Sequence, residues 1–185
     1  MSMLKDQPKN VTVNQLIAMG RNVLESYEKM DAAIDARLLA LYVLQCTSSE
    51  LILHGNDEVA DHIKESYMYM IAKRIQGIPL QYITKSQEFM GLEFYVDERV
   101  LIPRQDTETL VETIIEYSKQ NRVEKAVEVG VGSGCISISL VHYIKGLNIT
   151  AIDICENALV VAKKNVKAHQ LEEHITLLQS DVFKD

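Results

Sequence analysis

Three glycines directly after a short apolar segment are the residues whose types and spacing most suggest ligand chemistry. Gly130, Gly132 and Gly134 lie in the stretch VEVGVGSGCISISL, which covers residues 127–140. A parallel strand that turns sharply into a helix needs residues without a Cβ atom, and a ligand lying against that turn needs the same open backbone. The stretch therefore predicts either a tight structural turn or the floor of a pocket for a nucleotide-like ligand.

The spacing of these glycines distinguishes two classes of nucleotide-like ligand. The nicotinamide fingerprint G-x-G-x-x-G, or its alanine variant, would require glycine or alanine where this sequence has Cys135. The observed spacing is G-x-G-x-G, and the acidic Glu128 precedes it. S-adenosylmethionine has no pyrophosphate and carries a cationic sulfonium, which a nearby carboxylate suits. We therefore expect S-adenosylmethionine as the cofactor and keep a nicotinamide dehydrogenase as an alternative.

Two further acidic residues follow apolar segments in the same part of the chain. Asp153 could accept hydrogen bonds from both ribose hydroxyls. Asp181 could accept one from the adenine amino group, with Val182 or Phe183 packed on the adenine face. The local alternatives are Asp153 as a helix cap, Asp181 as a turn residue and Glu128 as a solvated strand end. The predicted cofactor-binding residues are Glu128, Gly130, Val131, Gly132, Ser133, Gly134, Asp153, Asp181, Val182 and Phe183.

The elements that must position these residues alternate between strand and helix. Apolar segments at residues 126–129, 149–152 and 175–179 predict strands, and helical patterns cover residues 135–145 and 157–169. This alternation builds a parallel sheet with right-handed crossovers. Because a doubly wound sheet usually has five or more strands, we expect the first strand to keep an unpaired apolar edge. We therefore also expect the chain to be a truncated form of a longer protein.

The first half of the sequence has helical patterns. Thr12 with Gln15, and Thr47 with Glu50, match the capping box, in which side chains satisfy backbone N–H groups that a helix start leaves free. A long helix after residue 56 should end at Gly77. A helix from about residue 31 is expected to bury an apolar stripe made of Ile34, Leu38, Leu41 and Tyr42.

The patterns change after residue 80. The segment EFMGLEFYV, residues 88–96, predicts a hairpin or two short strands around Gly91. After Pro103, either Asp106 or Thr107 should cap the next helix. The expected fold class is α/β, with an N-terminal all-α helical domain followed by a partial, three-strand, Rossmann-like class I methyltransferase domain. The expected boundaries are a helical substrate-recognition domain at 1–80, a β-hairpin linker at 81–104 and the N-terminal part of the S-adenosylmethionine-binding domain at 105–185.

Composition argues against several other classes of protein. The formal net charge of −7 weighs against a partner held through its phosphates, so no direct nucleic-acid binding is expected. The three cysteines form no Cys-x-x-Cys pair and the histidines are scattered, so no metal site is expected. The start of the chain, MSMLKDQPKN, lacks the apolar segment of a signal peptide, and no long apolar run occurs. These features predict a cytoplasmic protein with no membrane partner.

The motifs together resemble those of the release-factor glutamine methyltransferases, the HemK/PrmC family, over nearly the whole chain. The most specific segment is LIPRQDTETLVE, and VEVGVGSGCISISL, AIDICENALVVAKKN and LLQSDVF are similar to the segments that follow it in the family. The sequence departs from the family pattern at Ile78, Gln105, Val131 and Val182. The resemblance implies a helical part that helps recognise peptide chain release factors. It also implies that Arg104, Thr107 and Glu108 lie near the pocket mouth, although Thr107 as a cap and Glu108 as a helix-dipole partner are equally simple roles.

The resemblance also implies that a catalytic motif is missing from these residues. The family motif Asn-Pro-Pro-Tyr, which holds the glutamine amide for attack on the sulfonium methyl, does not occur in the sequence. We therefore predict no catalytic residues in this chain, no methyl transfer by these residues alone, and weak binding of S-adenosylmethionine. The implied activity is methylation of the glutamine side chain in the Gly-Gly-Gln loop of release factors. The alternatives are an amino-methyltransferase acting on nucleic acid and a non-catalytic release-factor-binding module.

Overall fold

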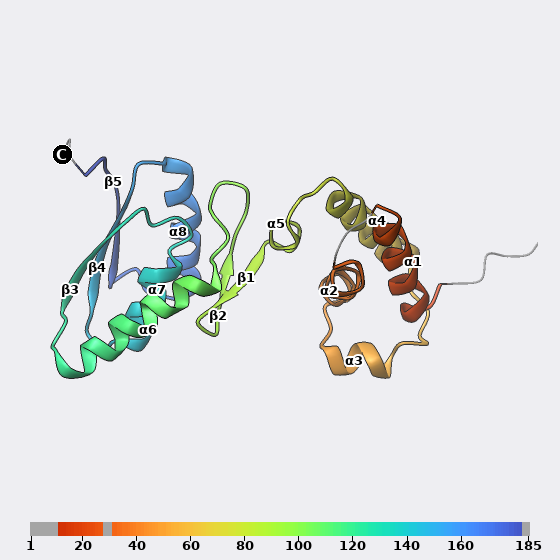
Figure 1. The fold of residues 1–185 in the computed structure, drawn as a ribbon, viewed down its shortest axis with the longest axis horizontal. Coiled ribbons are helices and arrows are strands. Elements are labelled where there is room, and N and C mark those ends of the chain that lie inside the picture. The colour runs from red at the N-terminus through yellow and green to blue at the C-terminus, as the bar shows by residue number, and fades with distance from the viewer. Residues whose placement is uncertain (1–10, 28–30, 183–185) are drawn as a thin grey trace, which may run out of the picture. The chain divides into compact units, whose positions relative to one another are not determined.

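The computed structural model describes residues 11–27 and 31–182 of the 185-residue chain. The chain divides into two compact units, Met1–Thr84 and Lys85–Asp185. Each unit has its own hydrophobic core. Figure 1 shows that the first unit is built from helices and that the sheet lies in the second. The expected order, an all-α part followed by an α/β part, is confirmed.

The helical unit contains α1 (Val13–Ser26), α2 (Ala32–Leu44), α3 (Ser48–Leu53), α4 (Asp61–Ile75) and the short α5 (Leu80–Thr84). Both predicted capping boxes are present. At α1 the Thr12 Oγ1 atom accepts from the Gln15 backbone N–H at 3.3 Å, and the Gln15 side chain accepts from the Thr12 N–H at 2.9 Å. Thr47 and Glu50 form the equivalent pair at α3. Local sequence therefore sets where these two helices begin.

The stripe predicted for α2 was wrong, because the helix buries its small residues instead. Ile34, Leu38 and Tyr42 are exposed, and only Leu41 of the predicted stripe packs against the core. Small side chains let neighbouring helices approach closely, and a buried hydroxyl bonds across the gap: Tyr67 Oη donates to the Ala36 carbonyl at 3.0 Å. The buried face of α2 consists of Ala32, Asp35, Ala36, Leu39 and Ala40.

A buried ion pair ties α4 to the same face of α2. The Arg74 Nε atom donates to Asp35 Oδ2 at 2.5 Å, and both side chains are largely buried. Arg74 also reaches the Ile78 carbonyl at 3.4 Å, just after the helix ends. The pair supplies a partner for a carboxylate that would otherwise be costly to bury. Gly77, with φ of +87°, follows the end of α4 where the sequence predicted it.

The second unit opens with the predicted hairpin. Strands β1 (Ser86–Phe89) and β2 (Leu92–Tyr95) pair antiparallel, and Met90 and Gly91 form the turn with φ of +54° and +71°. Phe89 and Phe94 are buried in the core of this unit, so the hairpin is part of the unit. Helix α6 (Gln105–Gln120) follows, with Arg104 at its N-cap and no side-chain cap. The predicted cap by Asp106 or Thr107 was therefore wrong, because the helix begins at Gln105.

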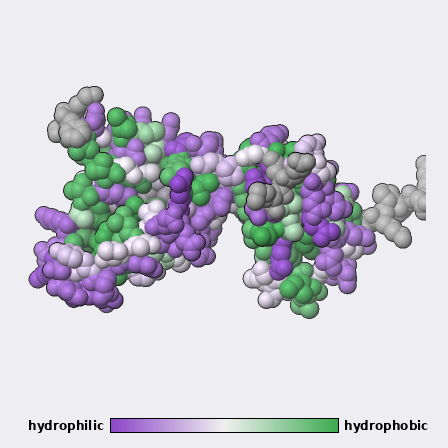
Figure 2. All heavy atoms as spheres, viewed as in Figure 1, coloured by the Kyte–Doolittle hydropathy of each residue, from purple (hydrophilic) through white to green (hydrophobic). Residues whose placement is uncertain are grey.

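Strands β3 (Lys125–Val129), β4 (Asn148–Asp153) and β5 (Ile175–Gln179) form a parallel sheet in that order, as predicted. The crossovers are α7 (Cys135–Tyr143) and α8 (Glu156–Ala168). Figure 1 shows these helices on one side of the sheet. Among the described strands, β3 lies at the end of the order, as expected, and the side chains of Val127 and Val129 on one face of it are 69% and 61% exposed. Figure 2 shows hydrophobic residues at the surface over the strands.

Candidate functional site

The parallel register brings the predicted acidic residues to one edge of the sheet. Val129 of β3 is paired with Ile152 of β4, and Asp153 is paired with Gln179 of β5. The residues that follow these strands therefore leave the sheet at the same, carboxyl end. In open α/β sheets, ligands bind in the crevice outside this end.

The glycine turn, residues 130–134, folds back onto the next strand. The backbone N–H groups of Gly130 and Val131 both donate to the Ile152 carbonyl, at 2.8 and 3.0 Å. Gly130, Gly132 and Gly134 all have positive φ, at +79°, +53° and +82°. Such a conformation suits glycine and strains other residues.

The three glycines differ in what surrounds them. A Cβ atom added to Gly130 or Gly132 would meet nothing within 4 Å, so both face open space. A Cβ atom added to Gly134 would lie 3.3 Å from the Ile138 side chain and 3.6 Å from the Ala162 Cβ. The first two glycines therefore offer open backbone to a ligand, whereas the third lets α7 and α8 pack closely. This arrangement fits a nucleoside-type group at Gly130 and Gly132.

Asp153 is fixed by two backbone N–H groups. Its Oδ2 atom accepts from Gly132 at 3.0 Å, and its Oδ1 atom accepts from Cys155 at 2.9 Å. Cys155 is the N-cap of α8 and no side chain caps this helix, so Asp153 is not the helix cap that the sequence left open, and its ligand role stays a prediction. An ionised carboxylate has about four lone-pair sites, and two are used here. The remaining two are available to hydroxyl donors.

Glu128 is half-buried and contacts the start of α7. One carboxylate oxygen accepts from the Ser137 backbone N–H at 3.0 Å and also from the Ser137 hydroxyl. Burial raises the pKa of Glu128 to about 7, because the charged form loses its hydration, and the hydrogen bonds from Ser137 offset only part of that effect. Glu128 is therefore not the solvated strand end that sequence reasoning left open.

The other predicted cofactor residues have different surroundings. The side chains of Val131 and Ser133 are buried, at 3% exposed each, so only their backbone can face a ligand. Val182 follows β5 and is 47% exposed, and Asp181 beside it is half-buried. Phe183 lies outside the described residues.

Sequence reasoning missed Asn165, which joins the glycine turn to the hairpin. Its side-chain amide donates to the carbonyls of Tyr95 and Ser133 at 2.9 and 2.8 Å, and its Oδ1 atom accepts from the Tyr95 N–H at 2.8 Å. It is only 1% exposed. The signal was a polar residue at helical spacing with the apolar face of α8, whose other buried members are Ala158, Val161, Ala162 and Val166.

The three residues predicted at the pocket mouth lie at the start of α6. Glu108 accepts a hydrogen bond from the Met90 N–H at 2.7 Å and so holds the turn of the hairpin. Arg104 is exposed, and the Thr107 N–H donates to the Arg104 carbonyl at 3.0 Å. Glu108 thus has a structural contact, and the role of all three at the pocket mouth stays a prediction.

The remaining functional expectations concern metals and membranes. In the described ranges, 11–27 and 31–182, no three His, Cys, Asp or Glu side chains are grouped to hold a metal ion. None of the helices formed by those same residues is long and apolar enough to cross a membrane.

Comparison with known proteins finds two family matches and several curated relatives. Residues 15–84 match the family described as the PrmC N-terminal domain, and residues 105–185 match the methyltransferase small domain. The release factor glutamine methyltransferase of Clostridium acetobutylicum is 36% identical over 81% of this chain and 53% of its own length. That of Moorella thermoacetica is 38% identical over 80% of this chain and 52% of its own. The chain is thus similar to release factor glutamine methyltransferases over most of its length.

The chain spans about half the length of these two curated relatives of the release factor glutamine methyltransferase family. Among solved structures, an O-methyltransferase family protein from Burkholderia thailandensis matches 43% of this chain and 24% of its own, with 15% identity and a TM-score of 0.38. The match to the methyltransferase small domain supports S-adenosylmethionine as the cofactor. The open glycines and the two fixed carboxylates fit its nucleoside and its cation.

Proposed function

We propose that the protein, at its full natural length, is a cytoplasmic enzyme that methylates the glutamine side-chain amide in the Gly-Gly-Gln loop of peptide chain release factors. The match to the methyltransferase small domain supports methyl transfer, and the names of the curated relatives support the release factor as the substrate. The sheet edge described above supplies the cofactor end of such a site.

The observation that carries the cofactor assignment is the hydrogen bond from Gly132 to Asp153, made beside two glycines that face open space. This hydrogen bond fixes the position of the carboxylate against the turn before any ligand arrives. Binding therefore loses little conformational entropy in ordering the carboxylate. We assign the two free lone-pair sites of Asp153 to the ribose hydroxyls. Gly130 and Gly132 admit the nucleoside without a side chain in its way.

The other predicted residues take supporting roles in this proposal. Bound S-adenosylmethionine supplies a methyl group on a cationic sulfur. Glu128 places a carboxylate near the turn, and a cation beside it favours its ionised form and lowers its pKa from about 7. Val131 and Ser133 contribute backbone only. Asp181 and Val182 follow the third strand, and we assign them to the adenine.

Calorimetric titration of the full-length protein with S-adenosylmethionine tests the cofactor site. The substitution Asp153→Ala should abolish detectable binding, because it removes both ribose acceptors and the partner of Gly132. The matched control is Glu172→Ala, an exposed carboxylate of the same unit outside the sheet edge, which should bind like the wild type. Unchanged affinity in Asp153→Ala removes this residue from the site, and binding of NADH in place of S-adenosylmethionine would favour a dehydrogenase.

Transfer of labelled methyl groups tests the substrate. The full-length protein is incubated with labelled S-adenosylmethionine and either a release factor or DNA. Label should appear on the release factor, and a release factor whose loop glutamine is replaced by alanine should stay unlabelled. Label on DNA instead would support an amino-methyltransferase of nucleic acid. Binding of the release factor with no transfer to either would support a non-catalytic docking module.

A further inference from the structure

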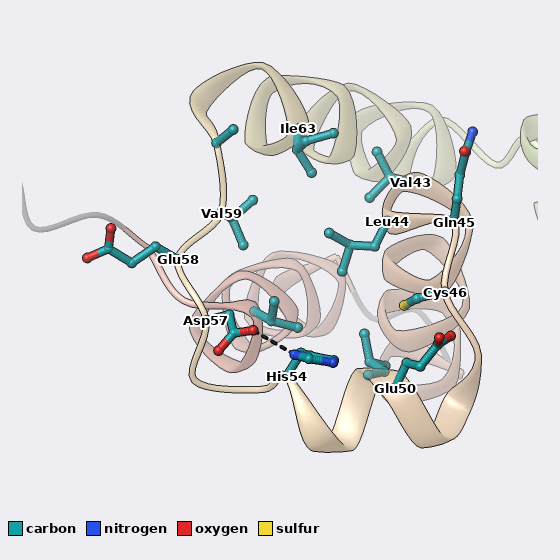
Figure 3. Close-up of a pocket in the computed structure, with 13 residues that line it drawn as sticks. Val43, Leu44, Gln45, Cys46, Glu50, His54, Asp57, Glu58, Val59 and Ile63 are labelled. Atoms are coloured by element: carbon teal, nitrogen blue, oxygen red, sulfur yellow. Dashed lines mark hydrogen bonds and ion pairs between the residues drawn. The ribbon is translucent and has the colours of Figure 1, made fainter.

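The helical unit contains a cavity of about 580 Å³ that the cofactor site does not use. It is surrounded by the end of α2, by α3, by the segment 57–60 and by the starts of α1 and α4. Figure 3 shows Val43, Leu44, Val59 and Ile63 pointing into it. Its volume falls within the usual range of ligand sites, and its lining is predominantly apolar.

Three of the residues that line this cavity, Glu50, Asp57 and Glu58, are acidic, and we call them the carboxylate rim. His54 lines the cavity beside them, and no Lys or Arg of residues 11–27 and 31–182 does so. Contacts with Thr47 lower the pKa of Glu50, so this member of the rim is ionised at neutral pH. Figure 3 places Glu50 and Glu58 on opposite sides of the cavity, with the 2.7 Å contact between His54 and Asp57 at its edge.

Two carboxylates of the rim already have partners within the helical unit. Glu50 completes the capping box of α3, and Asp57 accepts from or pairs with His54. The structure leaves no buried side-chain oxygen or nitrogen unpartnered in the described part of this unit, since the one such atom in residues 11–27 and 31–182 is Ser139 Oγ, in the other unit. The described part of this unit therefore has no buried, unpaired polar side-chain atom that could bind a small ligand through a directed hydrogen bond. What the cavity offers is apolar surface and negative potential.

We propose that this cavity binds an apolar side chain presented by a basic protein segment, with leucine-like groups inside and lysine or arginine near the carboxylate rim. Apolar burial supplies the affinity, and the rim selects the sign of the flanking charges. Peptide grooves that take apolar anchors flanked by charges follow the same logic. This inference concerns the helical unit alone and does not rest on the proposed methyl transfer.

The test uses the peptide acetyl-KKALLAKK-amide as the probe and the methyl signals of this chain in NMR spectra as the readout. Titration should shift the methyl signals of Val43, Leu44, Val59 and Ile63. Two control peptides separate the contributions: acetyl-KKASSAKK-amide lacks the apolar anchor, and acetyl-EEALLAEE-amide reverses the charge. Neither should shift these signals at the same concentration. Equal shifts from either control, or shifts confined to other residues, would overturn the proposal.

A charge variant tests the rim without disturbing the fold. Glu50→Gln, Asp57→Asn and Glu58→Gln are combined, because glutamine still completes a capping box and asparagine still accepts from His54. This variant should bind the probe about tenfold more weakly, as the sum of three modest charge contributions. The matched control combines Glu25→Gln, Asp31→Asn and Glu65→Gln, which removes the same charge from exposed positions of the unit outside the cavity.

Comparison of the two charge variants, and of the peptide with hexylamine, shows what determines affinity for the cavity. An equal loss in both variants would mean diffuse attraction to an acidic protein, and the proposal fails. Hexylamine, a small organic cation, is titrated in parallel. If it shifts the same signals at equal or lower concentration than the peptide, the occupant is a small amine and the proposal of a protein segment is overturned. Circular dichroism of each variant confirms that the helices are retained.

Discussion

Asn165 holds the backbone of Tyr95 by both of its polar groups: its Oδ1 accepts from the Tyr95 N–H at 2.8 Å, and its Nδ2 donates to the Tyr95 carbonyl at 2.9 Å. The same Nδ2 donates to Ser133 in the glycine turn. One buried amide on α8 therefore fixes the last residue of the hairpin to the turn that would face the cofactor. Rigid support of this kind is what a preorganised site requires.

The substitution Asn165→Ala should destabilise the protein and loosen the site together. It leaves buried groups of Tyr95 and Ser133 without partners, at a total cost of about 3 kcal/mol in the free energy of unfolding. Urea unfolding measures the stability, and calorimetry measures the affinity for S-adenosylmethionine, which should fall. Asn157→Ala, at an exposed position of the same helix, is the matched control and should change neither. Wild-type affinity in Asn165→Ala would show that the turn keeps its shape unaided.

Alanine at Gly132 should weaken cofactor binding far more than it affects folding. The positive φ of +53° strains an alanine by about 1–2 kcal/mol, and its methyl group would enter the open space assigned to the nucleoside. We expect at least a tenfold loss of affinity for S-adenosylmethionine in calorimetry.

Gly146→Ala is the control for that loss, since Gly146 has a φ of +79°, faces open space and lies beyond the far end of α7. It carries the same backbone strain and should bind the cofactor normally. Gly134→Ala should instead lower stability, because its methyl group meets Ile138 and Ala162. Equal binding by Gly132→Ala and Gly146→Ala would refute the ligand role of Gly132.

The raised pKa of Glu128 predicts a specific dependence of stability on pH. Since the pKa is about 7 in the folded protein and about 4.3 when unfolded, the folded state binds more protons between these values. The contribution of protonated Glu128 to stability is therefore complete below about pH 4.3 and is lost as the pH rises through 7. Between pH 5 and 8, the wild type should lose roughly 2–3 kcal/mol more than Glu128→Gln, as measured by urea unfolding.

The pH dependence of cofactor affinity is a second test of Glu128. The cation of S-adenosylmethionine favours the ionised form of Glu128, so the affinity of the wild type should increase severalfold from pH 6 to pH 8. Glu128→Gln keeps an oxygen that can accept from Ser137 but cannot ionise, so its affinity should stay flat over this range. Parallel pH profiles for the two proteins would place Glu128 outside the reach of the cation.

Asp97 should make the second unit sensitive to acid. The Arg99 guanidinium holds the pKa of Asp97 well below its usual range, with further hydrogen bonds from the Arg99 backbone and the Tyr95 hydroxyl. The stability from this carboxylate is present above the unfolded pKa of about 3.9 and is lost as the pH falls through the lower, folded value.

Asp97→Asn should therefore lower the free energy of unfolding by about 2 kcal/mol at pH 7, with a smaller difference at pH 2. Urea unfolding at both pH values checks this. Glu98→Gln removes the neighbouring carboxylate, which pairs with Lys85 at the surface, and should have no measurable effect. An Asp97→Asn penalty that is independent of pH would mean that the loss comes from packing and not from charge.

Local chemistry made much of the fold predictable. The capping boxes of Thr12 and Thr47 depend on residues three positions apart, and the strand–helix alternation after residue 125 depends on short apolar runs. Both signals lie within a single window of sequence. The order of the acidic residues after successive strands was predictable for the same reason, because parallel strands with crossover helices all end at one edge.

Contacts between distant segments explain what was missed. Ile34 and Leu38 looked like the core face of α2, but the close approach of Tyr67 to Ala36 makes the alanine face the buried one. The partner of Glu128 is a serine of the following helix, and the partners of Asn165 lie in the hairpin and the glycine turn. Only the folded chain brings these pairs together. The absence of methyl transfer by these residues alone stays a prediction.

Amide hydrogen exchange at the outer edge of β3 can show whether another segment pairs with the sheet. Among the strands of residues 11–27 and 31–182, only β4 pairs with β3, so none of them protects from water the β3 N–H groups that point away from β4. Deuterium should replace these protons quickly, while the β4-facing protons of the same strand exchange slowly. Any chain segment that comes to lie beside β3 would slow the fast set alone, so a few amide signals can record how that sheet is extended.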